Sequence, residues 1–85
     1  MRVTIPSPLL SYTQRRDVTA TGGTLAEVLR DLDRQYPGIR FRMVDEQDRI
    51  RPHMRVFLDR DETRDLAARL DAARTLHIVQ ALSGG

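Results

Sequence analysis

The sequence contains no cysteine, no lysine and no tryptophan. Without cysteine, the chain cannot form a disulfide, a zinc–thiolate site or a cysteine nucleophile. Without lysine, no side-chain amine of this chain can accept the C-terminus of another protein. The first residues lack the apolar run of a signal peptide, and no stretch approaches the roughly 20 apolar residues of a membrane span. We therefore expect a cytoplasmic protein with no membrane partner.

The sequence also has few aromatic residues and a small net charge. Only two phenylalanines and two tyrosines are present, and fourteen arginines face twelve acidic residues for a net charge of +2. The charges interleave, as in Asp59-Arg60-Asp61-Glu62, so no basic stripe stands out, and few rings are available to stack on bases. We expect no nucleic-acid binding. The two histidines, His53 and His77, lie far apart, so no metal site is predicted.

The length of 85 residues corresponds to one domain. Folding at this size buries about 60% of the surface of the unfolded chain, which supports one modest core and leaves little room for an enclosed active site. The size therefore favours a binding or carrier module over an enzyme, and no catalytic residue is predicted. The acidic residues of the turns, such as Asp45, Asp59 and Glu62, are expected to be solvated with ordinary pKa values.

The first half of the chain predicts a hairpin followed by a helix. Residues 2–5 and 17–21 alternate apolar and polar side chains, which is typical of half-buried strands, and a polar connection spans 11–16. Thr24 and Glu27 have the spacing of a capping box. The apolar residues that follow have helical spacing, and Pro37-Gly38 ends the helix. These apolar residues are Leu25, Val28, Leu29, Leu32 and Tyr36.

The second half predicts two further strands. Residues 39–53 read as irregular, and 54–59 alternate so that Phe57 points outward. A charged turn covers 59–62, and 63–74 fit either a short helix or a 3₁₀ turn. The last strand, 75–79, leaves Val79 on the same outward face as Phe57. The result is a two-layer α+β domain, with a mixed sheet of four to five strands crossed by one main helix.

The chain ends in Gly84-Gly85. Glycine lacks a Cβ, so such an end can thread a channel too narrow for side chains. We interpret residues 80–85 as a flexible tail behind a domain of residues 1–79, leaving from a rigid sheet edge and reaching roughly 20 Å when extended. The alternative is an ordinary frayed terminus.

Several segments together resemble the ubiquitin-like sulfur-carrier family, whose members are MoaD/ThiS-like proteins. The longer middle segment is most similar to the cysteine-pathway carrier of actinobacteria. Two departures are visible: Ala73-Arg74 replaces a Gly-Asp turn, and Gln80 replaces a proline that often precedes the tail. The segments that carry the resemblance are Val3-Thr4-Ile5-Pro6, Thr24-Leu25, Leu29-Arg30-Asp31-Leu32, Tyr36-Pro37-Gly38, Ile50-Arg51-Pro52-His53, Val56-Phe57-Leu58-Asp59, Asp61-Glu62-Thr63-Arg64, His77-Ile78-Val79 and Ala81-Leu82-Ser83-Gly84-Gly85.

The resemblance implies a β-grasp fold and a modified C-terminus. A ubiquitin-activating-type adenylyltransferase (MoeB/ThiF-like) would adenylate the carboxylate of Gly85 with ATP and magnesium, and a sulfur donor would convert it to a thiocarboxylate. The chain would bind no cofactor itself and would be a monomer when free. Further implied partners are a sulfur-accepting synthase and a zinc metallopeptidase. The pathway would be cysteine biosynthesis first, then molybdopterin, thiamine or tRNA thiolation.

The partner is expected to contact two regions. The tail residues Ala81, Leu82, Ser83 and Gly84 would lie in its channel. Phe57 and Val79 would form an exposed apolar docking face, since apolar side chains grouped on one face often mark a partner site. Arg64 and Arg74 are either steering charges or solvated surface residues. Two other functions stay open: a protein modifier conjugated through Gly85 to lysines of other proteins, and a plain interaction domain with an inert tail.

Overall fold

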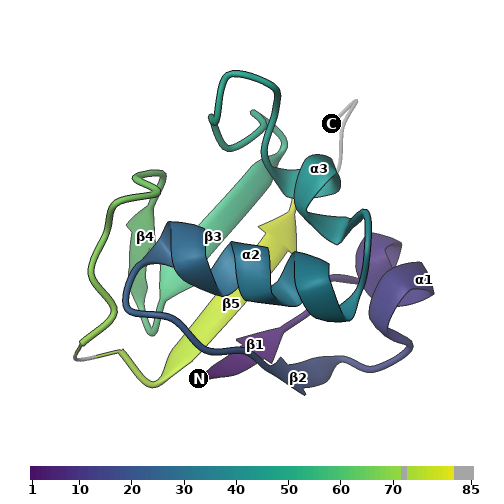
Figure 1. Cartoon of the computed structure of the whole chain (residues 1–85), viewed down its shortest axis with the longest axis horizontal. Helices are drawn as coiled ribbons and strands as arrows, with labels where there is room; N and C mark the ends of the chain where they lie inside the picture. Colours follow the sequence, from purple (N-terminus) through teal and green to yellow (C-terminus); the bar gives the residue numbers. More distant parts are fainter. Residues whose placement is uncertain (72, 82–85) are drawn as a thin grey trace.

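The computed structural model describes residues 1–71 and 73–81, which form a five-stranded sheet with a helix lying across one face (Figure 1). The strand order is β2-β1-β5-β3-β4. The elements are β1 (Arg2–Thr4), η1 (Ser7–Leu9), α1 (Leu10–Thr13), β2 (Asp17–Thr19), α2 (Leu25–Gln35), α3 (Ile39–Met43), β3 (Met54–Leu58), β4 (Asp61–Thr63) and β5 (Thr75–Gln80). The predicted α+β architecture with one main helix is confirmed.

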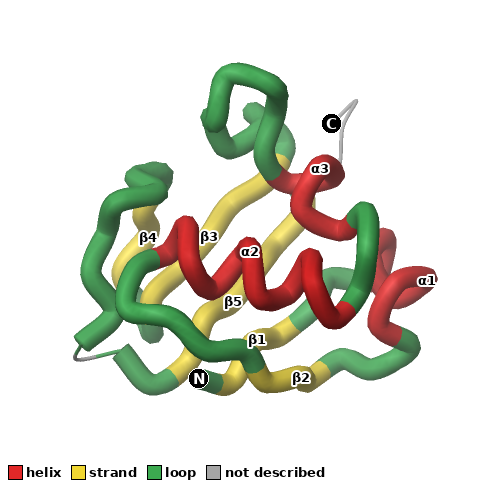
Figure 2. Tube along the Cα trace, in the orientation of Figure 1, coloured by secondary structure: helices red, strands yellow, loops and turns green. Residues whose placement is uncertain are grey.

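The last strand lies in the middle of the sheet. β5 pairs in parallel with β1 on one side and antiparallel with β3 on the other, while β2 and β4 form the two edges (Figure 2). The prediction that the tail leaves from a sheet edge is therefore wrong. Parallel strands need a crossover connection, and the chain between β1 and β5 makes it, so β5 fills the gap between the two hairpins. β5 also includes Gln80, which the sequence assigned to the tail.

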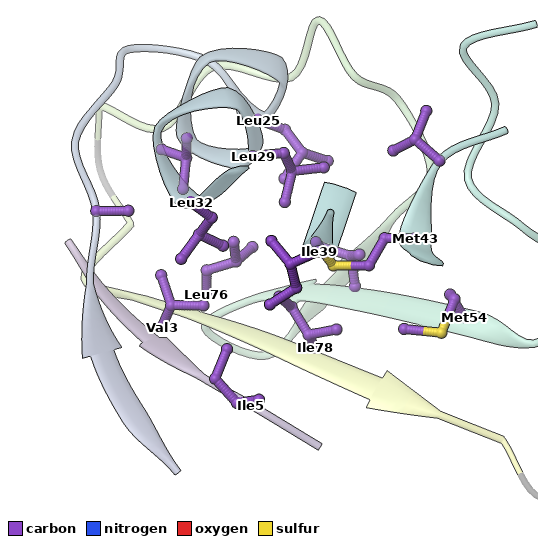
Figure 3. Close-up of a cluster of buried hydrophobic side chains, with 14 of the residues drawn as sticks. Val3, Ile5, Leu25, Leu29, Leu32, Ile39, Met43, Met54, Leu76 and Ile78 are labelled. Carbon is purple, nitrogen blue, oxygen red and sulfur yellow. The ribbon is translucent and has the colours of Figure 1, made fainter. Parts of the chain in front are cut away.

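The core lies between α2 and the inner face of the sheet (Figure 3). Leu25, Val28, Leu29 and Leu32 of α2 are fully buried, as the helical spacing predicted, whereas Tyr36 is the C-cap and is partly buried. Alternate residues of the strands meet the helix from below, since side chains at i and i+2 share a face. The buried strand residues are Val3, Val18, Met54, Val56, Leu76 and Ile78, and Ile5, just after β1, is buried with them.

The N-terminus of α2 has the predicted capping box. The backbone N–H of Glu27 donates to Thr24 Oγ1 at 3.3 Å, and Glu27 Oε1 accepts the N–H groups of Thr24 and Gly23 at 3.1 and 2.7 Å. Gly22 has φ +157°, and a Cβ there would lie 2.7 Å from the backbone nitrogen of Val28. Only a residue without a side chain lets the chain approach the helix this closely.

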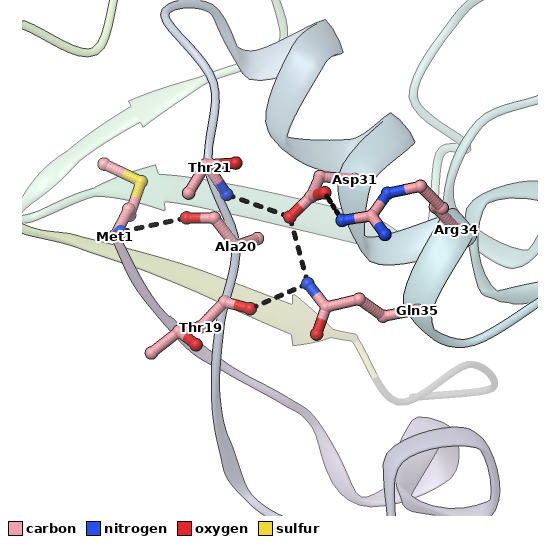
Figure 4. A network of polar contacts seen from close by, with 7 residues as sticks. All are labelled: Met1, Thr19, Ala20, Thr21, Asp31, Arg34 and Gln35. Atoms are coloured by element: carbon pink, nitrogen blue, oxygen red, sulfur yellow. Dashed lines mark hydrogen bonds and ion pairs between the residues drawn. The ribbon is translucent and has the colours of Figure 1, made fainter.

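Asp31 ties α2 to the end of the first hairpin (Figure 4). Its Oδ2 accepts the N–H of Thr21 and the amide of Gln35, both at 3.0 Å, and its Oδ1 accepts from the Arg34 guanidinium. Gln35 also donates to the carbonyl of Thr19 at 3.0 Å. The hydrogen bond from Arg34, followed by that from Thr21, lowers the pKa of Asp31. We call this group the Asp31 clamp.

Three local predictions are wrong. The connection after β1 is helical over 7–13, because a turn of helix there buries Leu9 and Thr13. Residues 39–43 form α3, in which Ile39 and Met43 are one turn apart and both fully buried. Neither pattern is long enough to show helical periodicity in a sequence.

The third correction concerns residues 63–74, which form no helix among the described residues. β4 ends at Thr63, and turns follow. The carbonyls of Leu66 and Ala68 accept the first N–H groups of α2, those of Ala26 and Leu25, at 2.8 and 3.0 Å. Those donors have no partner inside their own helix, so the segment is held in the form that satisfies them. No helix in the described part of the chain has the length and apolar character to cross a membrane.

Candidate functional site

The site predicted from the sequence lies only partly within the described residues. Gly85, Gly84, Ser83 and Leu82 fall outside them, so the structure places only the start of the tail. Gln80 pairs with Met54 across β5 and β3, and the N–H of Ala81 donates to the carbonyl of His53 at 2.7 Å. We call Gln80, Ala81 and His53 the tail root. It extends the β5–β3 pairing by one further bond, so the chain leaves the sheet in a defined direction.

Arg64 holds the segment that carries the tail root. Its Nη1 donates to the carbonyl of Met54 at 2.8 Å, and its Nη2 donates to those of Ile50 and Arg51 at 2.5 and 2.9 Å. These acceptors lie on both sides of His53. Arg64 is exposed, as expected of a surface charge, but its head group also binds the main chain, which the sequence did not predict. We call this arrangement the Arg64 clamp.

The outward orientation of Phe57 and Val79 is confirmed. Val79 is 42% exposed, and Phe57 is half-buried on the sheet face opposite α2. Between them and β1 lies a shallow hollow of about 600 Å³, and its floor includes His77 and Thr4. Phe57 stands opposite His77 in the β3–β5 pair, and Thr4 Oγ1 lies 2.9 Å from His77 Nδ1. We call this surface the outer face.

Charged side chains frame Phe57. Arg55 binds Glu62 through two hydrogen bonds of 3.0 and 2.6 Å, and its guanidinium lies 5.3 Å from the centroid of the Phe57 ring. The hydrogen bond from Arg55 lowers the pKa of Glu62. The pKa of Asp45 is also lowered, and the largest cause is the hydrogen bond from the backbone N–H of Arg49. The expectation of ordinary pKa values at these two acids is therefore wrong, since a carboxylate that accepts hydrogen bonds favours its charged form.

Asp59 closes the turn that precedes β5 and contains Ala73 and Arg74. Its Oδ1 accepts the N–H groups of Arg74 and Thr75 at 3.2 and 3.0 Å, and its own N–H donates to the carbonyl of Thr75 at 2.9 Å. Asp59 has φ 55°, in the left-handed region that Asp tolerates better than most residues. The turn is thus held by a side chain from the preceding hairpin. Within residues 1–71 and 73–81, no three His, Asp or Glu side chains group to hold a metal ion.

The fold is that of the ubiquitin-like β-grasp proteins. Among solved structures, a chain of the Amycolatopsis orientalis BexX/CysO complex matches with a TM-score of 0.89 and 28% identity, covering 99% of this chain and 98% of that one. Mycobacterium tuberculosis CysO matches with a TM-score of 0.87 and 25% identity, covering 95% and 98%. No protein-family model and no curated protein sequence matches the chain.

A third structure, SAMP1 from Haloferax volcanii, matches with a TM-score of 0.78 and 20% identity, covering 100% of this chain and 98% of that one. At that identity the match shows the shared fold alone. The matches to CysO-containing structures confirm the predicted resemblance to ubiquitin-like sulfur carriers over nearly the full chain.

Proposed function

We propose that this chain is a sulfur-carrier protein that is thiocarboxylated at Gly85. The observation that carries the proposal is the similarity to CysO over nearly the whole chain, combined with a terminal Gly84-Gly85. The tail root supports it, because a C-terminus that leaves a central strand in a defined direction is suited to presentation to an enzyme. The chain would act as a substrate for partner enzymes, without catalysis of its own.

The chemistry would take place in two steps at the carboxylate of Gly85. A carboxylate oxygen attacks the α-phosphorus of ATP, and magnesium pyrophosphate leaves. Hydrosulfide, as the sulfur donor, then attacks the acyl carbon, and AMP leaves with that oxygen, so that the chain ends in a thiocarboxylate after loss of the proton from sulfur. ATP and magnesium would belong to an adenylyltransferase partner. The anionic sulfur, like a thiolate, is the nucleophilic form that a sulfur-accepting synthase would use.

The test is the mass of the intact chain after incubation with the host's ubiquitin-activating-type adenylyltransferase, ATP and a sulfur donor. We expect a gain equal to one exchange of oxygen for sulfur. A variant lacking Gly85 should stay unchanged. Sulfur acquisition by that shortened variant would contradict the proposal. Cysteine biosynthesis is the pathway we propose first, and a gene for a cysteine synthase or a zinc metallopeptidase beside this one would support it.

We further propose that the outer face docks the adenylyltransferase through Phe57 and Val79. Phe57→Ser is expected to raise the KM for the carrier by about tenfold, because loss of a well-packed aromatic anchor costs more than about 1 kcal/mol. The maximal rate should stay unchanged, since Phe57 lies three residues along β3 from Met54, the partner of Gln80, and is not part of the tail root. An unaltered KM in pyrophosphate-exchange assays would exclude this role.

Two alternatives predict other outcomes of the same experiments. A protein modifier would form higher-mass adducts that persist on reducing denaturing gels and disappear without Gly84-Gly85. An interaction domain with an inert tail would keep its partner affinity after the same deletion. A modifier and a carrier would both be adenylated at Gly85. The product formed from the adenylate distinguishes them, because a modifier would form a protein adduct and a carrier a thiocarboxylate.

A further inference from the structure

A second hollow, of about 250 Å³, lies next to the tail root and away from the outer face. Its lining residues are Phe41 and Arg42 of α3 and Arg51 and His53 of the following loop. α3 lies beside α2, on the covered side of the sheet (Figure 1). We call this surface the α3 hollow. Phe41 is 55% exposed, more than Val79 at 42%. Such an exposed aromatic side chain is a candidate contact for a partner protein.

The α3 hollow is held in place by hydrogen bonds. Arg51 Nε donates to the carbonyl of Phe41 at 2.8 Å, and its guanidinium carbon lies 4.7 Å from the centroid of the Phe41 ring. The main chain of Arg51 donates to Met43 at 2.9 Å and accepts from Arg64 at 2.9 Å. A surface that is ordered before binding loses little side-chain entropy when a partner arrives.

The charge of the α3 hollow is positive. Its lining contains two arginines and a histidine and no carboxylate. Among the ion pairs of the described residues, none includes Arg42 or Arg51. Two acids of the intervening loop bind other groups: Asp48 pairs with Arg40, and Asp45 accepts the backbone N–H groups of Gln47 and Arg49. The charge of Arg51 also acts on Asp45, where it helps to lower the pKa of that carboxyl.

The position of the α3 hollow beside the tail root indicates which partner would bind there. His53 lines the α3 hollow, and the same residue holds Ala81 through its carbonyl. An enzyme that takes the residues after Ala81 into its active site would therefore come close to this surface. Guanidinium groups with free Nη donors bind carboxylates in a two-point geometry. The ring of Phe41 adds an apolar wall beside them.

We propose that the α3 hollow docks an acidic segment of the enzyme that adenylates the tail, with carboxylates on Arg42 and Arg51 and an apolar side chain on Phe41. This inference rests on the proposed function. It gives the enzyme two contacts that flank the tail root, the apolar outer face on one side of the sheet and a basic hollow on the other. The second contact selects partners by charge.

Charge reversal at Arg42 is the test, because its side chain makes none of the hydrogen bonds found among the described residues. Arg42→Glu is expected to raise the KM for the carrier by at least about tenfold, since like charges across an interface are strongly unfavourable, with kcat within about twofold. The KM of the parent chain should rise with salt, and that dependence should flatten in the variant. Arg42→Lys should keep most of the affinity.

Arg60→Glu is the matched control, because Arg60 is exposed beyond the far end of β3 and carries the same charge change. Equal KM values for Arg42→Glu and Arg60→Glu, in a system that adenylates the parent chain, would overturn the docking inference alone. Failure of the parent chain to form an adenylate would overturn the proposed function, and the inference would fall with it. Circular dichroism and thermal unfolding of each variant verify that the fold is retained.

Discussion

The Asp31 clamp and the Arg64 clamp both hold segments of the chain together through hydrogen bonds, but the two side chains carry opposite charges. In each, one charged side chain makes hydrogen bonds to three groups, and at least one of them lies ten or more positions away in the chain. Asp31 accepts hydrogen bonds and ties α2 to the end of the first hairpin. Arg64 donates hydrogen bonds and ties β4 to the segment around His53.

The difference lies in how each clamp responds to pH. A carboxylate can be protonated, and the Asp31 clamp is then lost. An arginine guanidinium keeps its charge throughout the pH range of protein chemistry. The segment around His53, which binds Ala81, is therefore held by a contact insensitive to pH, whereas the junction of β2 and α2 is sensitive to acid. Loss of one clamp should leave the other intact.

The largest expected effect is that of Arg64→Ala. Three carbonyls lose a charged donor, and two of these bonds are partly buried. We expect the free energy of unfolding to fall by about 1–2 kcal/mol, because water replaces the donor only in part. Urea unfolding measures this loss. The amide of Ala81 should also exchange with solvent faster, since its acceptor His53 lies between the released carbonyls.

Two control variants sharpen that prediction. Arg69→Ala removes an exposed arginine whose one ion pair among the described residues is with Asp71 at 3.3 Å, and it should change neither quantity. Asp31→Asn should leave the exchange of Ala81 unchanged. Unaltered protection of the Ala81 amide in Arg64→Ala would show that the tail root does not depend on the clamp.

A smaller effect is expected from the acid sensitivity of Asp31. Its pKa is lowered in the folded chain, first by the hydrogen bond from Arg34. The carboxylate therefore adds stability above the ordinary Asp pKa of about 3.9, and this is lost as the pH falls through the lower folded value. At pH 7, Asp31→Asn should lower the Tm by less than about 5 °C.

Thermal unfolding between pH 7 and pH 2 measures this effect. The Tm difference between the parent chain and Asp31→Asn should shrink below about pH 4. Asp71→Asn is the control, because Asp71 forms an exposed pair with Arg69 and no other ion pair within residues 1–71 and 73–81. A Tm difference that stays constant down to pH 2 would mean that the hydrogen bonds of Asp31 do not depend on its charge.

Local patterns in the sequence predicted the parts of the fold that arise from local causes. The capping box at Thr24 and Glu27, the buried stripe of α2 and the outward side chains Phe57 and Val79 are all confirmed. Each follows from a period of 3.6 or 2 residues, or from a cap within four residues. The predicted boundary at residue 79 is one residue short, since β5 continues through Gln80.

Features that depend on distant residues could not be predicted in this way. Residues 63–74 have helix-like spacing, yet the open N–H groups of α2 hold them as turns. α3 exists because Ile39 and Met43 find room in the core. Arg64 was interpreted as a surface charge because the carbonyls that it binds lie 10 to 14 positions earlier.

The sequence by itself determined which faces are apolar, where the main helix begins and ends, and that two glycines stand at positions 84 and 85. Only the tertiary structure decided that β5 lies between β1 and β3, and that Phe41, Arg42, Arg51 and His53 meet beside Ala81. The physical reason is the distance along the sequence over which each kind of interaction acts. Periodicity and capping act over a few residues, whereas strand order and the partners of a long arginine side chain depend on contacts that form only when the core closes.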